Sequence, residues 1–147
     1  MGDPAGIGPE VIAKALADKA LTRLCIPVVV GSRQVLERTI AWLKLPLQVV
    51  DFNPATGQRL KAGQVAVADP LERPLPKFRM GVATAVTGAA SIAFIKEAVT
   101  LAQAGSLGGI VTAPINKEAM NMAGFHYPGH TELLADLTQT TEFGMMI

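Results

Sequence analysis

Segments with the period of a helix alternate along this chain with short apolar segments that have the composition of buried strands. The helical patterns lie at 9–16, around Leu36, Ile40 and Leu43, and at 87–104. Such alternation is typical of an α/β fold with a parallel or mixed sheet. We therefore predict a mostly parallel sheet flanked by helices. The predicted strands are 26–30, a weaker one at 48–51, 64–67, and 107–112.

Glycine and proline residues set the ends of several of these elements. Gly8 can cap a helix in which Pro9 takes the first position, because proline suits the start of a helix. Residues 53–77 contain repeated prolines and glycines and are predicted to be mostly loop. The Ala-rich stretch 87–104 predicts a long helix that ends near Gly105.

The composition excludes several classes of protein. With 147 residues and 50% hydrophobic content, the chain can bury a core, and its formal net charge of +1 offers no basic surface for a nucleic acid backbone. The longest uncharged run, 80–95, is shorter than a bilayer requires, so we predict no membrane segment. The single Cys25 cannot form an intramolecular disulfide, and the N-terminus lacks a signal pattern. We expect a cytoplasmic protein.

Asn116 and Lys117 follow the predicted strand 107–112, which Pro114 brings to an end. Ligands of open α/β sheets bind outside the carboxyl ends of the strands. Lys117 would begin a helix that closes at 123–124 with a glycine C-cap, and a cation in the first turn opposes the helix dipole. An anionic partner would explain this lysine. The alternative is that Lys117 is simply a solvated residue of the first turn.

The loop 126–132 places His130 and Thr131 at the N-terminus of another predicted helix. Thr131 is a natural N-cap, and an imidazole beside a hydroxyl at a helix N-terminus can form an anion pocket. The alternative leaves Thr131 to capping and His130 to a hydrogen bond within the loop. For His126 we favour a structural role. We reject a metal site between the two histidines, because proline and glycine interrupt the helix that would align them.

The opening loop 3–10 has two glycines that let its backbone approach a ligand, and a helix follows it. Val11 stands where a dinucleotide-binding loop would have its third glycine, so we favour a tight turn. No strand leads into this loop, and an apolar strand begins at 143–147 without a flank. We expect a fragment of a longer protein.

Three motifs in register are similar to those of the 4-hydroxythreonine-4-phosphate dehydrogenase family of pyridoxal phosphate biosynthesis. The resemblance implies an isocitrate/isopropylmalate dehydrogenase-like fold, with residues 1–147 as the N-terminal portion of a longer two-domain α/β enzyme. It also implies a homodimer that uses NAD or NADP and a divalent metal ion, whose three histidine ligands would lie beyond residue 147. An isolated half should then be inactive. The motifs are Gly2-Asp3-Pro4-Ala5-Gly6-Ile7-Gly8-Pro9-Glu10, Thr112-Ala113-Pro114-Ile115-Asn116-Lys117 and Gly129-His130-Thr131-Glu132.

The resemblance further implies that His130 and Thr131 contact a phosphorylated substrate, with Lys117 and Asn116 in the same pocket. It leaves the role of Asp3 open and assigns no catalytic residue, cofactor-binding residue or metal ligand within this chain. The implied reaction oxidises the C3 hydroxyl of 4-phosphohydroxy-L-threonine with hydride transfer to the nicotinamide. The resulting 3-keto acid would lose carbon dioxide to give 3-amino-1-hydroxyacetone phosphate.

Several alternatives stay open at the level of sequence. Relatives of the same family oxidise 4-phospho-D-threonate, 4-phospho-D-erythronate or aromatic dihydrodiol carboxylates. The segments 116–119 and 127–134 are together at least as similar to the phospho-sugar-acid branch. From other classes, the chain could be a non-catalytic binding or dimerisation module, or an acyltransferase-like relative that would require coenzyme A.

Overall fold

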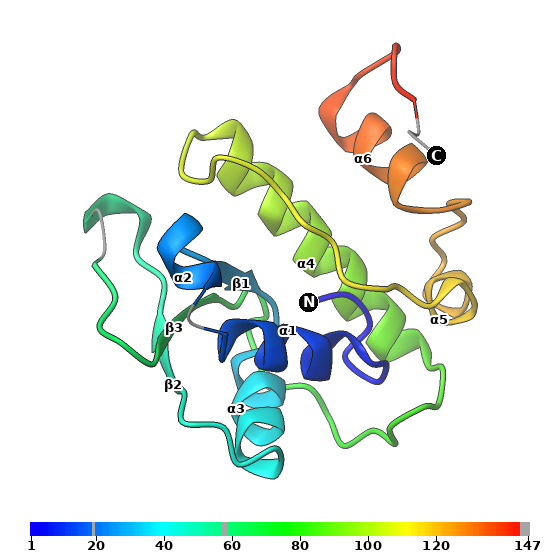
Figure 1. The fold of residues 1–147 in the computed structure, drawn as a ribbon. Helices are drawn as coiled ribbons and strands as arrows, with labels where there is room; N and C mark the ends of the chain where they lie inside the picture. The colour runs from blue at the N-terminus through cyan, green and yellow to red at the C-terminus, as the bar shows by residue number, and fades with distance from the viewer. Residues whose placement is uncertain (19, 57–58, 145–147) are drawn as a thin grey trace.

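The computed structural model describes residues 1–18, 20–56 and 59–144, which form a three-stranded parallel sheet and its flanking helices. The strands β1 (Val28–Val30), β2 (Gln48–Asp51) and β3 (Gln64–Ala68) lie in the order β1-β3-β2, and β3 pairs in parallel with both neighbours. The predicted α/β class with a parallel sheet is confirmed. The helices in Figure 1 are α1 (Gly8–Leu16), α2 (Leu21–Leu24), α3 (Arg33–Trp42), the short 3-10 helix η1 (Pro54–Thr56), α4 (Ala85–Gln103), α5 (Lys117–Met122) and α6 (His130–Thr138).

Helices cover both faces of the sheet. On one face, α1 and α3 pack on alternate residues of the strands, and this cluster contains Ala13, Leu16, Val29, Leu36, Ile40, Val49, Val65 and Val67. On the other face, α4 contributes Ala90, Phe94 and Ala98 to a cluster with Val30 of β1. The sheet therefore forms the middle layer, because its apolar residues alternate between the two faces.

A second side of α4 supports the C-terminal helices. Ile92 and Ile95 of α4 form a buried cluster with Met120 of α5 and Leu133 of α6. By length and composition α4 could cross a membrane, but core helices of soluble proteins meet the same criterion, and half of its apolar window is buried here. Its packing on β1, α5 and α6 makes it the central helix of the fold (Figure 1).

Most predicted elements occur close to their predicted positions. The strand β2 has the predicted bounds, β3 is one residue longer, and β1 omits Ile26 and Pro27. The long helix and the helix that ends before Gly124 are also confirmed. The short α2 was not predicted. The helix α1 begins at Gly8 itself, so Ile7 takes the N-cap position that was predicted for Gly8.

The predicted strand at 107–112 is wrong. This segment has no strand assignment, and Val111 is 100% exposed. A strand exists only where its backbone pairs with a neighbour. Among the described residues, one backbone hydrogen bond from another part of the chain reaches the loop after this segment. Asp3 N–H donates to the Pro114 carbonyl at 3.0 Å. The expected strand at 143–147 falls mostly outside the described residues, and 143–144 are coil.

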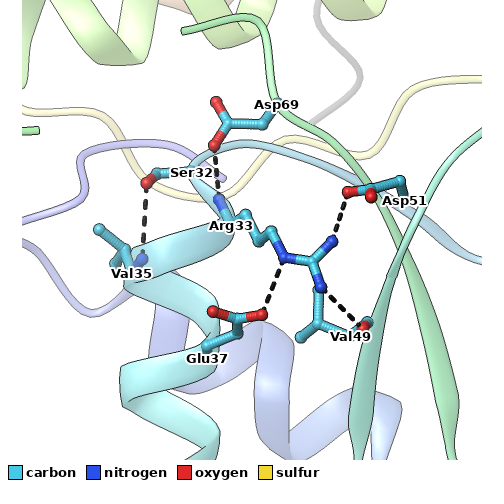
Figure 2. Close-up of polar contacts among 7 residues, drawn as sticks. All are labelled: Ser32, Arg33, Val35, Glu37, Val49, Asp51 and Asp69. Carbon is cyan, nitrogen blue, oxygen red and sulfur yellow. Dashed lines mark hydrogen bonds and ion pairs between the residues drawn. The ribbon is translucent and has the colours of Figure 1, made fainter. Parts of the chain in front are cut away.

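Arg33 fastens the carboxyl ends of β2 and β3 to the start of α3 (Figure 2). Its guanidinium forms ion pairs with Glu37 and Asp51 and donates to the Val49 carbonyl, and its backbone N–H donates to Asp69. The Ser32 hydroxyl caps the helix by accepting from Val35 N–H. The carboxyl ends of β2 and β3 are thus linked to α3 by side chains of the protein itself.

We expect Arg33→Met to lower the free energy of unfolding by about 1 kcal/mol, because exposed ion pairs contribute roughly 0.2–1 kcal/mol each. Urea unfolding of the variant measures this loss, and added salt should reduce the difference from the wild type. Lys14→Met is the matched control, since it removes a single pair with Glu10 and should cost less. Equal stability of wild type and Arg33→Met would show that these pairs contribute nothing.

Candidate functional site

The opening loop is held against the loop that follows the segment 107–112. The Met1 amino group donates to the Val30 carbonyl at 2.7 Å, at the carboxyl end of β1. Asp3 is 3% exposed, and its carboxylate accepts from Ala5 N–H at 2.8 Å while its own N–H reaches Pro114. Asp3 therefore fixes the shape of the loop and links two of the three motifs.

The close contact between the opening loop and Pro114 requires a glycine at position 2. Its φ is +74°, and a Cβ at this position would lie 2.3 Å from the Pro114 carbonyl oxygen. A side chain would push the two loops apart. The tight-turn interpretation of the opening loop thus has a physical basis in close backbone packing.

His130 belongs to the same place in the fold. It is the first residue of α6 and lines a small cavity of about 70 Å³ together with Met1, Gly2, Thr112 and Ala113. Parts of all three motifs therefore meet near the carboxyl end of β1. Sequence reasoning placed these motifs in different loops, and only the folded chain shows which of their residues touch.

The His130 imidazole is half-buried, and its Nε2 has no hydrogen-bond partner among the described residues. Burial lowers the pKa of His130 below its usual value. A hydrogen bond with the Ala113 backbone opposes this shift. This shift favours the neutral form of the imidazole. A buried polar atom without a partner is costly and points to a group that the folded chain does not itself supply.

The N-terminus of α6 has no side-chain cap. Gly129, with φ −175° and ψ −166°, is the N-cap residue, so the prediction that Thr131 caps the helix is wrong. Glycine offers no side chain, and Thr131 lies inside the first turn. In the described part of the chain, the backbone N–H groups of His130, Thr131 and Glu132 have no acceptor. Free N–H groups at the positive end of a helix are suited to an anion.

Asn116 and Lys117 have different roles at the start of α5. The Asn116 side chain accepts from Ala119 N–H at 3.0 Å and caps the helix, so its oxygen is already used. Lys117 is exposed and forms no ion pair with any described residue, which leaves its ammonium group available to an anion. The contacts within the described residues do not bring Lys117 against His130.

Gly88 is a structural residue of this region that sequence reasoning missed. It lies near the start of α4, and a Cβ there would be 1.9 Å from the Ala119 carbonyl oxygen of α5. The sequence did contain a sign of this role, because a glycine inside an Ala-rich helix costs about 1 kcal/mol of stability relative to alanine. Such a glycine is commonly kept where a neighbouring element packs closely against the helix.

The other candidate groups have local explanations. The His126 Nδ1 lies 3.1 Å from the Asn121 side-chain oxygen, in agreement with the structural role that we favoured. Within 1–18, 20–56 and 59–144, no group of three or more His, Cys, Asp or Glu residues could hold a metal ion. The described residues thus do not form a metal site of their own.

Comparison with known proteins places these motifs in a family. The model of the family described as pyridoxal phosphate biosynthetic protein PdxA matches residues 23–147. The chain belongs to the PdxA family. It is 38% identical, over its whole length, to a 4-hydroxythreonine-4-phosphate dehydrogenase of Trichlorobacter lovleyi, of which it covers 44%. It is 42% identical to a D-threonate 4-phosphate dehydrogenase of Pectobacterium atrosepticum, of which it covers 45%.

Solved structures of PdxA-family proteins share the fold. The crystal structure of a 4-hydroxythreonine-4-phosphate dehydrogenase from Burkholderia phymatum matches with a TM-score of 0.88 and 38% identity, and the match covers 97% of this chain and 43% of that one. The chain thus spans less than half the length of the relatives that it matches. The family resemblance of its three motifs is confirmed.

Proposed function

We propose that this chain forms the N-terminal portion of a two-domain, nicotinamide-dependent dehydrogenase and binds the phosphorylated end of its substrate. One observation carries this proposal. The N-terminus of α6 has no side-chain cap and presents N–H groups that have no acceptor among the described residues, and the buried Nε2 of His130 likewise has no partner there. A phosphate group would accept from these N–H groups, and it would also accept from Nε2 once the imidazole is protonated.

Each residue would act on the phosphate in a different way. Thr131 would donate its hydroxyl from the first turn of α6, and Lys117 would supply positive charge from the start of α5. Asn116 would hold Lys117 in place by capping α5, because its side-chain oxygen is engaged by Ala119 N–H. Binding energy from a remote phosphate orients the carbon that reacts.

The reaction that we propose is oxidation of 4-phosphohydroxy-L-threonine to the 3-keto acid, followed by decarboxylation to 3-amino-1-hydroxyacetone phosphate. NAD or NADP would accept the hydride, and a divalent metal would polarise the ketone from ligands beyond residue 147. The names of the relatives support a dehydrogenase. We further propose that the enzyme is a cytoplasmic homodimer.

A second substrate class has its own support. The chain is 42% identical to a protein named D-threonate 4-phosphate dehydrogenase. The phosphate site described above would serve 4-phospho-D-threonate or 4-phospho-D-erythronate equally well, because these substrates carry the same terminal group. The proposed site would therefore bind the phosphate that these substrates share, and it does not distinguish between the other parts of the substrates.

The test is nicotinamide reduction by the complete gene product, with a divalent metal and either NAD or NADP. Turnover of 4-phosphohydroxy-L-threonine would assign the enzyme to pyridoxal phosphate synthesis, and turnover of 4-phospho-D-threonate alone would assign it to sugar-acid metabolism. If neither substrate reduces the nicotinamide, the proposed activity is wrong. Activity that depends on coenzyme A would indicate an acyltransferase instead.

A further inference from the structure

A second concave surface lies at the amino ends of the strands, away from His130 and Ala113. Its volume is about 810 Å³, and it is bounded by α2 and the residues before β1 on one side and by the residues that lead into β2 and β3 on the other. Figure 1 shows α2 on the same side of the molecule as the connection between β2 and β3. We call this surface the amino-end groove. It is separate from the proposed phosphate site, and nothing in the proposed dehydrogenase reaction requires it.

The amino-end groove carries uncompensated positive charge. Arg23, Arg59 and Lys61 line it, and none of the described residues in its lining is an aspartate or glutamate. These three side chains are exposed and form no ion pair with any described residue. The net charge of the whole chain is only +1, so three cations in one groove are a local concentration. A concave surface lined by one sign of charge attracts counter-ions more strongly than a flat one.

Apolar groups make up much of the remaining lining. Leu16, Leu47 and Leu60 contribute side chains, and Ile26 is 67% exposed to solvent beside them. Exposed apolar side chains next to cations suit a ligand that has an anionic end and a flat apolar body. The groove volume lies in the range of about 300–1,000 Å³ that is common for small-molecule sites.

We propose that the amino-end groove binds a nucleoside phosphate. Its phosphates would meet Arg23, Arg59 and Lys61, and its base would lie on the apolar part of the lining. A simple inorganic anion would use the cations but leave the apolar surface exposed to water, so it should bind more weakly.

Cys25 gives this proposal a local readout. It lines the groove, it is exposed, and it is the sole cysteine of the sequence. A nucleotide in the groove would cover it. Alkylation of Cys25 by a maleimide, followed by mass spectrometry of its peptide, therefore reports occupancy of this groove and not of a nicotinamide site elsewhere in the complete gene product.

The experiment measures ATP binding by calorimetry and Cys25 alkylation with and without ATP. The groove variant combines Arg23→Gln, Arg59→Gln and Lys61→Gln. The matched control combines Arg73→Gln, Lys77→Gln and Arg79→Gln, which removes the same charge from exposed positions outside the groove lining. All six residues are exposed, so both variants should fold.

We expect ATP to slow the alkylation of Cys25 in the wild type and in the control. The groove variant should bind ATP at least about tenfold more weakly and lose this protection, because its charge-assisted contacts are gone. The proposal is overturned if ATP leaves the alkylation rate unchanged, or if both variants lose affinity equally. Pyrophosphate that protects Cys25 as well as ATP does would overturn the assignment to a nucleoside phosphate.

Discussion

Replacement of Gly88 by alanine is expected to destabilise the protein by about 1–3 kcal/mol, the usual cost of forcing an extra carbon into a packed contact. The direction of the change in stability is informative, because helix propensity alone would make the alanine variant more stable by about 1 kcal/mol. Here the new Cβ would lie 1.9 Å from the Ala119 carbonyl oxygen and 2.2 Å from its carbonyl carbon. Both are backbone atoms, so α5 as a whole would have to move.

Denaturant unfolding of the complete gene product measures this effect. Gly108→Ala is the matched control, since a Cβ at Gly108 meets no atom within 4 Å. That variant should unfold at the same denaturant concentration as the wild type. A stabilised Gly88→Ala protein would show that helix propensity outweighs packing and that α5 does not depend on this contact.

The same substitution should affect the proposed phosphate site through Lys117. Lys117 is the first residue of α5, and its N-cap Asn116 moves with the helix. If Lys117 binds the phosphorylated substrate, Gly88→Ala should raise KM more than it lowers kcat. A lower kcat with an unchanged KM would show that α5 does not take part in substrate binding.

The second large effect is expected at His130. We expect His130→Ala to lower kcat/KM of the complete gene product by about tenfold to a thousandfold, which corresponds to the loss of a charge-assisted contact of about 1.5–3 kcal/mol or somewhat more. The structural basis is the buried Nε2, which has no partner among the described residues. His126→Ala is the control, because that exposed ring already has a local partner in Asn121. Equal kcat/KM in wild type and His130→Ala would remove His130 from the site.

The pH dependence of binding gives an independent check on His130. A neutral imidazole has one N–H, and protonation provides a second donor for a phosphate. Because burial lowers the pKa of free His130, the ring should take up a proton when the anion binds. Affinity should then rise as the pH falls toward the pKa of the free ring. The substrate phosphate itself titrates near pH 6, so the relevant quantity is the difference between wild type and His130→Gln.

The sequence by itself determined the elements whose signals are local. The strand β2 and the end of α5 occur as predicted. These signals need only neighbouring residues, since a cap bonds to its own first turn and an apolar alternation reflects the strand's own geometry. Family membership was also predicted from sequence, and a family model matches residues 23–147.

Only the tertiary structure decided the features that depend on residues far apart in the chain. Residues 107–112 have the composition of a strand, yet a strand also needs a partner for its backbone, and composition does not supply one. The contacts of Asp3 with Pro114, His130 with Ala113 and Gly88 with Ala119 join residues that local patterns cannot relate. Folding placed these groups together because the helices had to cover the sheet and α4, and the site is a consequence of that packing.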